Sequence, residues 1–120
     1  MGNFCPNKHT KLCWQLGFNI SYPVGGETYH NGDEVSVTLQ IGSSGISHIM
    51  EVDVYAEDGK YYGPLITDQP VKGRSEVTLY FKLSLVRGNF PSGKYNYAAI
   101  GSYSFRGYCT VYSHLFNIVS

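Results

Sequence analysis

The segment EVSVTLQI, Glu34 to Ile41, carries the clearest structural signal of the chain, because every second residue has a branched aliphatic side chain. Successive side chains of a β-strand point to opposite faces of its sheet, so this alternation predicts a strand with one buried side and one solvent-facing side. The predicted inward residues are Val35, Val37, Leu39 and Ile41, and the outward ones are Glu34, Ser36, Thr38 and Gln40.

Two further segments repeat the alternation and bring the number of strong strands to three. In the first, Met50, Val52, Val54 and Ala56 are expected to face inward, opposite Glu51, Asp53, Tyr55 and Glu57. In the second, the inward series is Val77, Leu79, Phe81 and Leu83. Weaker signals predict strands at Phe18 to Tyr22, Tyr95 to Ser102 and Cys109 to Ile118, and a short edge strand near Tyr61 to Ile66.

The connections between these strands are too short to hold a crossover helix. Gly42 to Gly45, Asp58-Gly59 and Gly73 mark tight turns, which favours an antiparallel arrangement. About seven short strands with regular turns indicate an all-β fold, an immunoglobulin-like antiparallel β-sandwich with almost no helix. Tyr95, two residues after Gly93, resembles the tyrosine corner of such sandwiches, whose hydroxyl bonds back to the nearby main chain.

Length and composition limit the number of domains and the class of partner. A chain of 120 residues, 42% of them hydrophobic and 15% charged, has the size of one packed domain. We assign residues 17–120 to the sandwich and residues 1–16 to an N-terminal arm. Nine basic residues balance nine acidic ones, which excludes nucleic acid and anionic membranes as partners attracted by net charge. No apolar run approaches the roughly 18 residues of a transmembrane helix.

The cysteines indicate an oxidising, extracellular compartment. Cys5 and Cys13 lie in the N-terminal arm, and Cys109 lies near the other end of the chain. A disulfide between Cys13 and Cys109, with Cys5 as the alternative partner, ties the arm to the domain and stabilises it by about 4 kcal/mol in the chain-entropy model. The third cysteine is left free, pairs between molecules or has lost its partner. Asn19 opens an N-glycosylation sequon, as expected of a secreted or cell-surface glycoprotein.

No constellation of residues indicates catalysis, a cofactor or a metal. The sequence has no Gly-x-Ser-x-Gly elbow and no phosphate-binding loop followed by a helix. Glu51 and Asp53 lie on one face of one strand, whereas a glycosidase needs two carboxyl groups across a cleft. We therefore expect a protein that is not an enzyme. The histidines, which lack metal-ligand spacing, are His9, His30, His48 and His114.

Tyrosine is more abundant than one core requires, with eleven residues in the chain. An exposed tyrosine stacks on a sugar ring or anchors a protein interface, although strands also favour tyrosine for packing. Those in predicted turns are the best candidates for a ligand-binding surface: Tyr61, Tyr62, Tyr103 and Tyr108, together with Phe105.

Five stretches carry a resemblance to a known family: Ile20–Tyr29, Asn31–Asp33, Val52–Tyr55, Pro91–Tyr95 and Ser113–Ile118. They resemble the Ig-like N-terminal domain of fungal cell-wall proteins of the KRE/KNH type, which are often Ser/Thr-rich and GPI-anchored. The resemblance implies a secreted or wall-associated binding or structural domain connected with β-glucan organisation. Its partner would be wall polysaccharide or a neighbouring surface protein, and no catalytic residues carry over.

A second set of residues is similar to the ML lipid-recognition family: Cys13, Val71-Lys72-Gly73, Pro91–Tyr95, and Cys109 seven residues before Phe116. This resemblance implies a lipid carrier whose ligand occupies an elongated apolar cavity between two splayed sheets. The chain departs from that family at Asp68-Gln69-Pro70, where a Cys-Pro is expected. The lipid carrier is therefore the alternative function.

Overall fold

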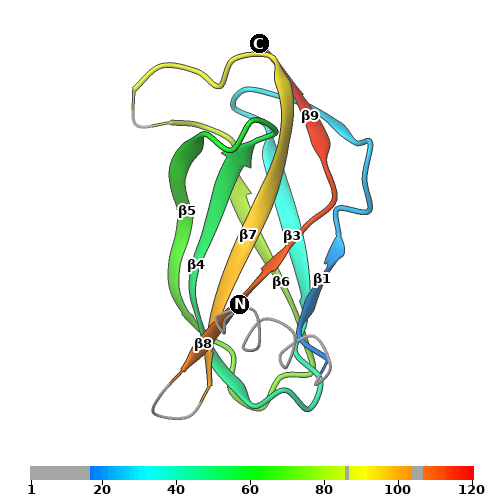
Figure 1. The fold of residues 1–120 in the computed structure, drawn as a ribbon, viewed down its shortest axis with the longest axis vertical. Helices are drawn as coiled ribbons and strands as arrows, with labels where there is room; N and C mark the ends of the chain where they lie inside the picture. Colours follow the sequence, from blue (N-terminus) through cyan, green and yellow to red (C-terminus); the bar gives the residue numbers. More distant parts are fainter. Residues whose placement is uncertain (1–16, 86, 104–106) are drawn as a thin grey trace.

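Two β-sheets make up the part of the chain that the structure, a computed structural model, describes: residues 17–85, 87–103 and 107–120. These residues form nine strands and no helix (Figure 1). The strands are β1 (Asn19–Tyr22), β2 (Thr28–His30), β3 (Glu34–Gln40), β4 (Ile46–Ala56), β5 (Tyr61–Pro70), β6 (Glu76–Lys82), β7 (Gly93–Tyr103), β8 (Tyr108–Tyr112) and β9 (Phe116–Val119). The all-β prediction is confirmed. The two additional strands are β2 and the second half of the last predicted strand, which is interrupted between β8 and β9.

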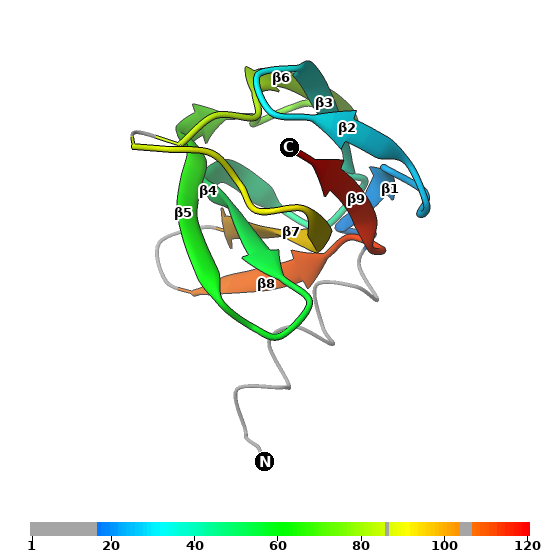
Figure 2. The ribbon, with the colours of Figure 1, turned by 90° about the horizontal axis from the view of Figure 1, so that it is seen from above.

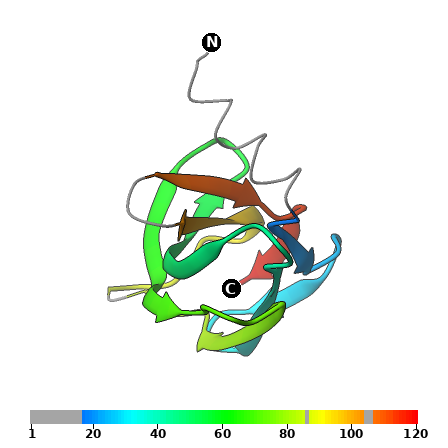
Figure 3. The ribbon, with the colours of Figure 1, turned by 90° about the horizontal axis from the view of Figure 1, so that it is seen from below.

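The two sheets pack face to face as a sandwich. The smaller sheet has the order β1-β3-β6, and the larger has the order β2-β9-β7-β4-β5, with β8 also paired to β7. Figures 2 and 3, which view the molecule from its two ends, show β3 and β6 on one side and β4, β7 and β8 on the other. Neighbouring strands are antiparallel except β2 and β9. The expectation of a purely antiparallel arrangement is wrong at that pair, because β9 runs antiparallel to β7 on one side and therefore in the same direction as β2 on the other.

The core lies between the sheets and is built from the alternating residues of the strong strands. Val37 and Leu39 are fully buried, as the alternation predicts, and so are Val52 and Val54. Aromatic rings complete the packing at the centre: the ring centroids of Tyr97 (β7) and Phe116 (β9) lie 4.5 Å apart. The ring of Tyr97 also meets Phe81 of β6 edge-on, with the centroids 5.6 Å apart, and this contact joins the two sheets.

Met50 departs from the predicted alternation. The pairing of β4 with β7 aligns Ile49 with Gly101 and Glu51 with Ile100, so Met50 is an extra residue in a β-bulge. Its side chain is 44% exposed, whereas Ile49 is fully buried. The prediction that Met50 faces the core is therefore wrong, because the bulge reverses the alternation for the residues before it.

The turn before β7 contains the predicted tyrosine corner. The hydroxyl of Tyr95 donates a hydrogen bond of 2.6 Å to the carbonyl oxygen of Pro91. Asn31 holds the same connection from the other side, because its side chain both accepts from and donates to the backbone of Phe90, at 2.7 and 3.0 Å. The corner prediction is confirmed.

The edge of the larger sheet differs from its prediction in length. β5 runs over 10 residues, past the expected end at Ile66, and pairs with β4 along its length. Within the described residues no helix is long and apolar enough to span a membrane.

Candidate ligand-binding face

The outer face of the larger sheet carries aromatic and acidic side chains from three strands. Residues that are directly paired across antiparallel strands place their side chains on the same face. Tyr55 of β4 is paired with Tyr61 of β5, and Asp53 of β4 is paired with Ala98 of β7, which is paired in turn with Tyr112 of β8. We call this surface the tyrosine face; its members are Glu51, Asp53, Tyr55, Tyr61, Tyr108 and Tyr112.

The exposed rings of the tyrosine face are spread along the sheet. Tyr61, Tyr108 and Tyr112 are 48%, 61% and 60% exposed. Tyr61 is paired with Tyr55, which is paired with Asn96 of β7, whereas Tyr108 is paired with Ser102 of β7. Asn96 and Ser102 are six residues apart along the strand, which corresponds to about 20 Å at 3.3–3.4 Å per residue. The face is therefore long enough to contact an extended ligand at several points.

Tyr55 and Tyr61 form the centre of the aromatic cluster. Their ring centroids lie 5.2 Å apart with the planes tilted by 49°. Burial raises the pKa of the Tyr55 hydroxyl, and the charges of Asp53, Tyr112 and Glu51 raise it further. The hydroxyls therefore stay protonated near neutral pH and act as hydrogen-bond donors to a ligand.

Asp53 is an acid beneath this cluster. It is only 3% exposed although it lies on the outer face, and its Oδ1 has no hydrogen-bond partner. Burial raises the pKa of Asp53 to about 7, and a hydrogen bond with Glu51, to which the protonated carboxyl donates, and the charge of that residue contribute to the shift. Buried polar atoms in proteins are normally paired, so the unpaired and buried carboxyl oxygen further disfavours ionisation of Asp53 in the folded protein.

The site residues that were proposed from the sequence lie in different parts of the structure. Tyr61 and Tyr108 lie on the tyrosine face. Tyr62 points to the opposite side of β5, where its ring packs 5.6 Å from those of Phe90 and Tyr95. The backbone of Tyr103 ends β7, whereas its side chain and Phe105 lie outside the described residues.

Sequence reasoning did not include Tyr55, Tyr112, Glu51 and Asp53 in the candidate site. Their signal was nevertheless visible, because Glu51, Asp53 and Tyr55 were predicted to share the solvent side of one strand. The pattern of a single strand, however, does not say which other strands lie beside it.

A second group of tyrosines lies beside the smaller sheet, with Tyr22 on β1, Tyr80 on β6 and Tyr29 on β2, the edge strand of the larger sheet. Tyr80 of β6 is 71% exposed. Together with Tyr22 and Tyr29, whose hydroxyls lie 3.4 Å apart, it lines a shallow cavity of about 260 Å³. This group has no acid comparable to Asp53: the carboxyl residue that lines the cavity is Glu34, which is exposed.

The remaining candidate residues are dispersed. Asn19 is half-buried in β1, and Cys109 is buried in β8. Both proposed partners of Cys109, Cys5 and Cys13, lie outside the described residues, so the pairing stays a prediction. The described part of the chain holds no group of three or more His, Cys, Asp or Glu side chains placed to bind a metal ion.

A lipid carrier of the ML type would need an elongated cavity between the sheets. The inward side chains of β3, β4 and β6 instead pack in one continuous cluster with those of β7 and β9. The cavities lined by described residues lie at one end, along the β5 edge and on the outer surface. We find no observation among the described residues that favours the lipid alternative.

Comparison with known proteins supports the fold. No protein-family model and no curated protein matches the chain. Among solved structures, fibronectin(III)-like modules of Clostridium thermocellum CbhA are similar, with 16% identity and a TM-score of 0.51 over 85% of this chain and 94% of the module. Titin M4 aligns at 16% identity over 86% and 94% of the two chains, with a TM-score of 0.39. At this identity the likeness to the CbhA modules shows the fold alone, a fibronectin(III)-like β-sandwich.

Proposed function

We propose that this chain is a non-catalytic binding domain that recognises a polysaccharide across the tyrosine face. One observation carries the proposal: three exposed tyrosines from β5 and β8 share a sheet face with the carboxyl groups of Glu51 and Asp53. Both acids come from one strand, so they flank no cleft and do not form the facing pair that glycoside hydrolysis requires.

The chemistry of the face suits a sugar chain. A pyranose ring presents C–H groups to an aromatic ring and hydroxyl groups to polar neighbours. Tyr61 and Tyr112 offer exposed rings on either side of Asp53, and the half-buried carboxyl group of Glu51 on the same face accepts a hydrogen bond from a hydroxyl group. The separation of Tyr61 and Tyr108 along the sheet favours an extended polymer over a single monosaccharide.

The proposed setting is a cell surface or cell wall. The resemblance to the KRE/KNH-type wall proteins, the cysteine at each end of the chain and the sequon at Asn19 support secretion. β-Glucan is accordingly the first polysaccharide to test. Intact mass of protein secreted from a eukaryotic host, with and without reductant, tests the disulfide and the glycan together.

The test of the proposed function is a pull-down with insoluble β-1,3-glucan, chitin and mannan, followed by titration with a soluble fragment of the polymer that binds. We expect Tyr61→Ala and Tyr112→Ala each to lower affinity about tenfold, the loss of one stacking contact. Tyr80→Ala is the matched control, because Tyr80 is more exposed than either residue but lies on the smaller sheet.

The control defines the outcomes. If Tyr80→Ala weakens binding as much as Tyr61→Ala does, the ligand does not bind at the tyrosine face. A protein that binds none of the three polymers would leave the face without a glycan ligand and would turn the search to a protein partner, the other occupant that such sandwiches accept.

A further inference from the structure

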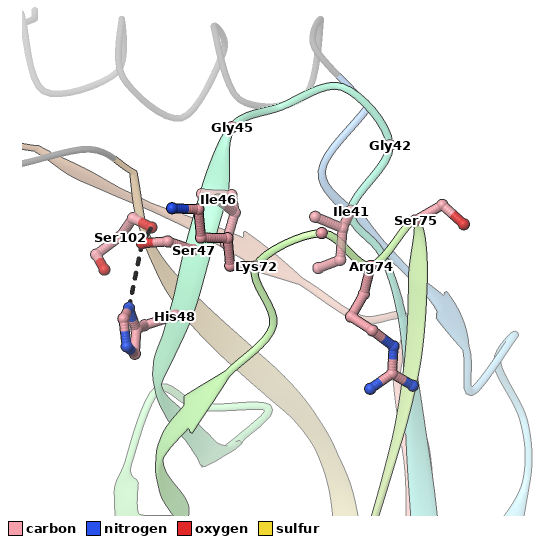
Figure 4. A pocket seen from close by; sticks show the side chains of 11 residues that line it. Ile41, Gly42, Gly45, Ile46, Ser47, His48, Lys72, Arg74, Ser75 and Ser102 are labelled. Atoms are coloured by element: carbon pink, nitrogen blue, oxygen red, sulfur yellow. Dashed lines mark hydrogen bonds between the residues drawn. The ribbon is translucent and has the colours of Figure 1, made fainter.

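The described residues line a cleft of about 830 Å³ at one end of the sandwich. One wall is formed by Ile41 and Gly42, which follow β3, and by Ser75 before β6; the other is formed by the start of β4 and by Ser102 of β7. The turn from β5 to β6 joins the two walls (Figure 4). The volume lies within the range of small-molecule sites, about 300–1,000 Å³.

The charged and ionisable groups lining this cleft are all basic. Lys72 and Arg74 come from the turn between β5 and β6, and His48 comes from β4. In Figure 4 the Lys72 side chain lies toward Ile46 and Ser102, while the Arg74 side chain lies on the side of Ser75. Among the described residues no Asp or Glu lines the cleft, and neither Lys72 nor Arg74 forms a salt bridge with any of them. Two cations without a described acidic partner therefore flank one cavity of a chain that has no net charge.

The imidazole of His48 is oriented by its neighbour. Nδ1 lies 3.1 Å from the hydroxyl oxygen of Ser47, and that hydroxyl lies 3.4 Å from the carbonyl oxygen of Ser102. In either tautomer the contact with Ser47 occupies Nδ1, so Nε2 is the ring nitrogen left for a ligand.

The base of the cleft is apolar. Ile41 and Ile46 are 2% and 3% exposed, and Gly42 and Gly45 bring no side chains to the rim. A Cβ atom at Gly45 would meet no other atom within 4 Å, so the rim there is open. An apolar base with cations at its margin matches a molecule that has an anionic head and an apolar body.

We propose that this cleft binds a small organic anion with an apolar body, such as a short-chain carboxylate, whose head group pairs with one of the two cations at its margin, Lys72 on one side or Arg74 on the other. Arg presents a planar fork of N–H donors to a carboxylate, and Lys presents a compact point charge. The site is separate from the tyrosine face and does not depend on the polysaccharide proposal.

The experiment is an amide NMR titration of the full chain with four probes: octanoate, inorganic phosphate, octylamine and octanol. We expect octanoate to shift the amide signals of Gly42, Gly45 and Gly73 saturably and to bind at least about tenfold more tightly than the other three. Phosphate that binds equally well would overturn the role of the apolar body, and octylamine or octanol that binds equally well would overturn recognition of the anion.

Two double variants complete the test. Lys72→Gln combined with Arg74→Gln is expected to weaken octanoate binding about tenfold or more, the loss of one or two charge-assisted hydrogen bonds. Lys82→Gln combined with Arg87→Gln removes the same charge from exposed residues outside the cleft and should leave binding unchanged. Equal weakening by both pairs, or no saturable binding of octanoate, would sink the proposal.

Discussion

The hydroxyl of Tyr95 donates a hydrogen bond of 2.6 Å to the carbonyl oxygen of Pro91, four residues earlier in the chain. Tyr95 is 2% exposed, and burial raises the pKa of its hydroxyl to about 12, so the group is a protonated donor at any pH at which the domain is studied. The bond fastens the end of the connection between β6 and β7 to the strand at the centre of the larger sheet.

Tyr95→Phe is therefore expected to destabilise the domain although it removes one oxygen atom. The Pro91 carbonyl loses its partner, and we expect the free energy of unfolding to fall by about 1–2 kcal/mol. Chemical denaturation followed by fluorescence measures the change. Tyr108→Phe is the matched control, because Tyr108 is 61% exposed and should change stability by less than about 0.5 kcal/mol. Equal stability of the two variants would contradict a structural role for the corner.

The bulge at Met50 makes a prediction that separates the observed register from the simple alternation. Ile49 is fully buried and Met50 is 44% exposed. We expect Ile49→Ala to cost about 2–5 kcal/mol of unfolding free energy, as large-to-small substitutions in a core do, and Met50→Ala to cost less than about 0.5 kcal/mol. Urea unfolding of both variants distinguishes the registers, since the reverse order would mean that Met50 faces the core.

The raised pKa of Asp53 predicts that the free energy of unfolding falls as the pH rises. Its pKa is raised to about 7 in the folded protein, against an ordinary value of 3.8. The folded state therefore holds a proton that the unfolded state has released between about pH 4 and pH 7. By linkage, the stabilisation is fully present below pH 4 and is lost as the pH passes through 7. We expect the decrease between pH 4 and pH 8 to exceed about 1 kcal/mol.

Two substitutions isolate this contribution, with thermal and urea unfolding measured at several pH values. Asp53→Asn cannot ionise and should remove the decrease, so the variant is expected to be more stable than the parent at pH 8. Glu51→Gln removes the neighbouring charge that helps to raise the Asp53 pKa, so the decrease should move to lower pH. An unchanged pH profile in Asp53→Asn would show that another group is responsible.

Gly101 of β7 packs directly against the side chains of Ile46 and Phe18. A Cβ atom there would lie 2.9 Å from Cδ1 of Ile46 and 3.0 Å from Cζ of Phe18, closer than carbon atoms normally approach. We expect Gly101→Ala to destabilise the domain by about 1–3 kcal/mol through overpacking. Gly93→Ala, at the exposed start of the same strand, has a nearest contact of 4.0 Å and is the control. Calorimetric melting of the two variants should give clearly different melting temperatures.

The local features of this protein follow from the order of its residues along the chain. The alternation in Glu34–Ile41 specifies which side of that strand is buried, because the two-residue period of a strand belongs to the chain itself. The tyrosine corner is equally local, since Tyr95 and Pro91 are four residues apart. These features were enough to predict the all-β sandwich.

Which residues become neighbours in space depends instead on how the whole chain folds. The bulge at Met50 exists because β4 must pair with β7 in a particular register, and that register depends on residues about 50 positions away. The tyrosine face has the same origin: Tyr61 and Tyr112 flank Asp53 because β5, β4, β7 and β8 are neighbours in one sheet. The pattern of one strand gives the side on which a residue lies, but the packing of the whole chain selects its neighbours on that side.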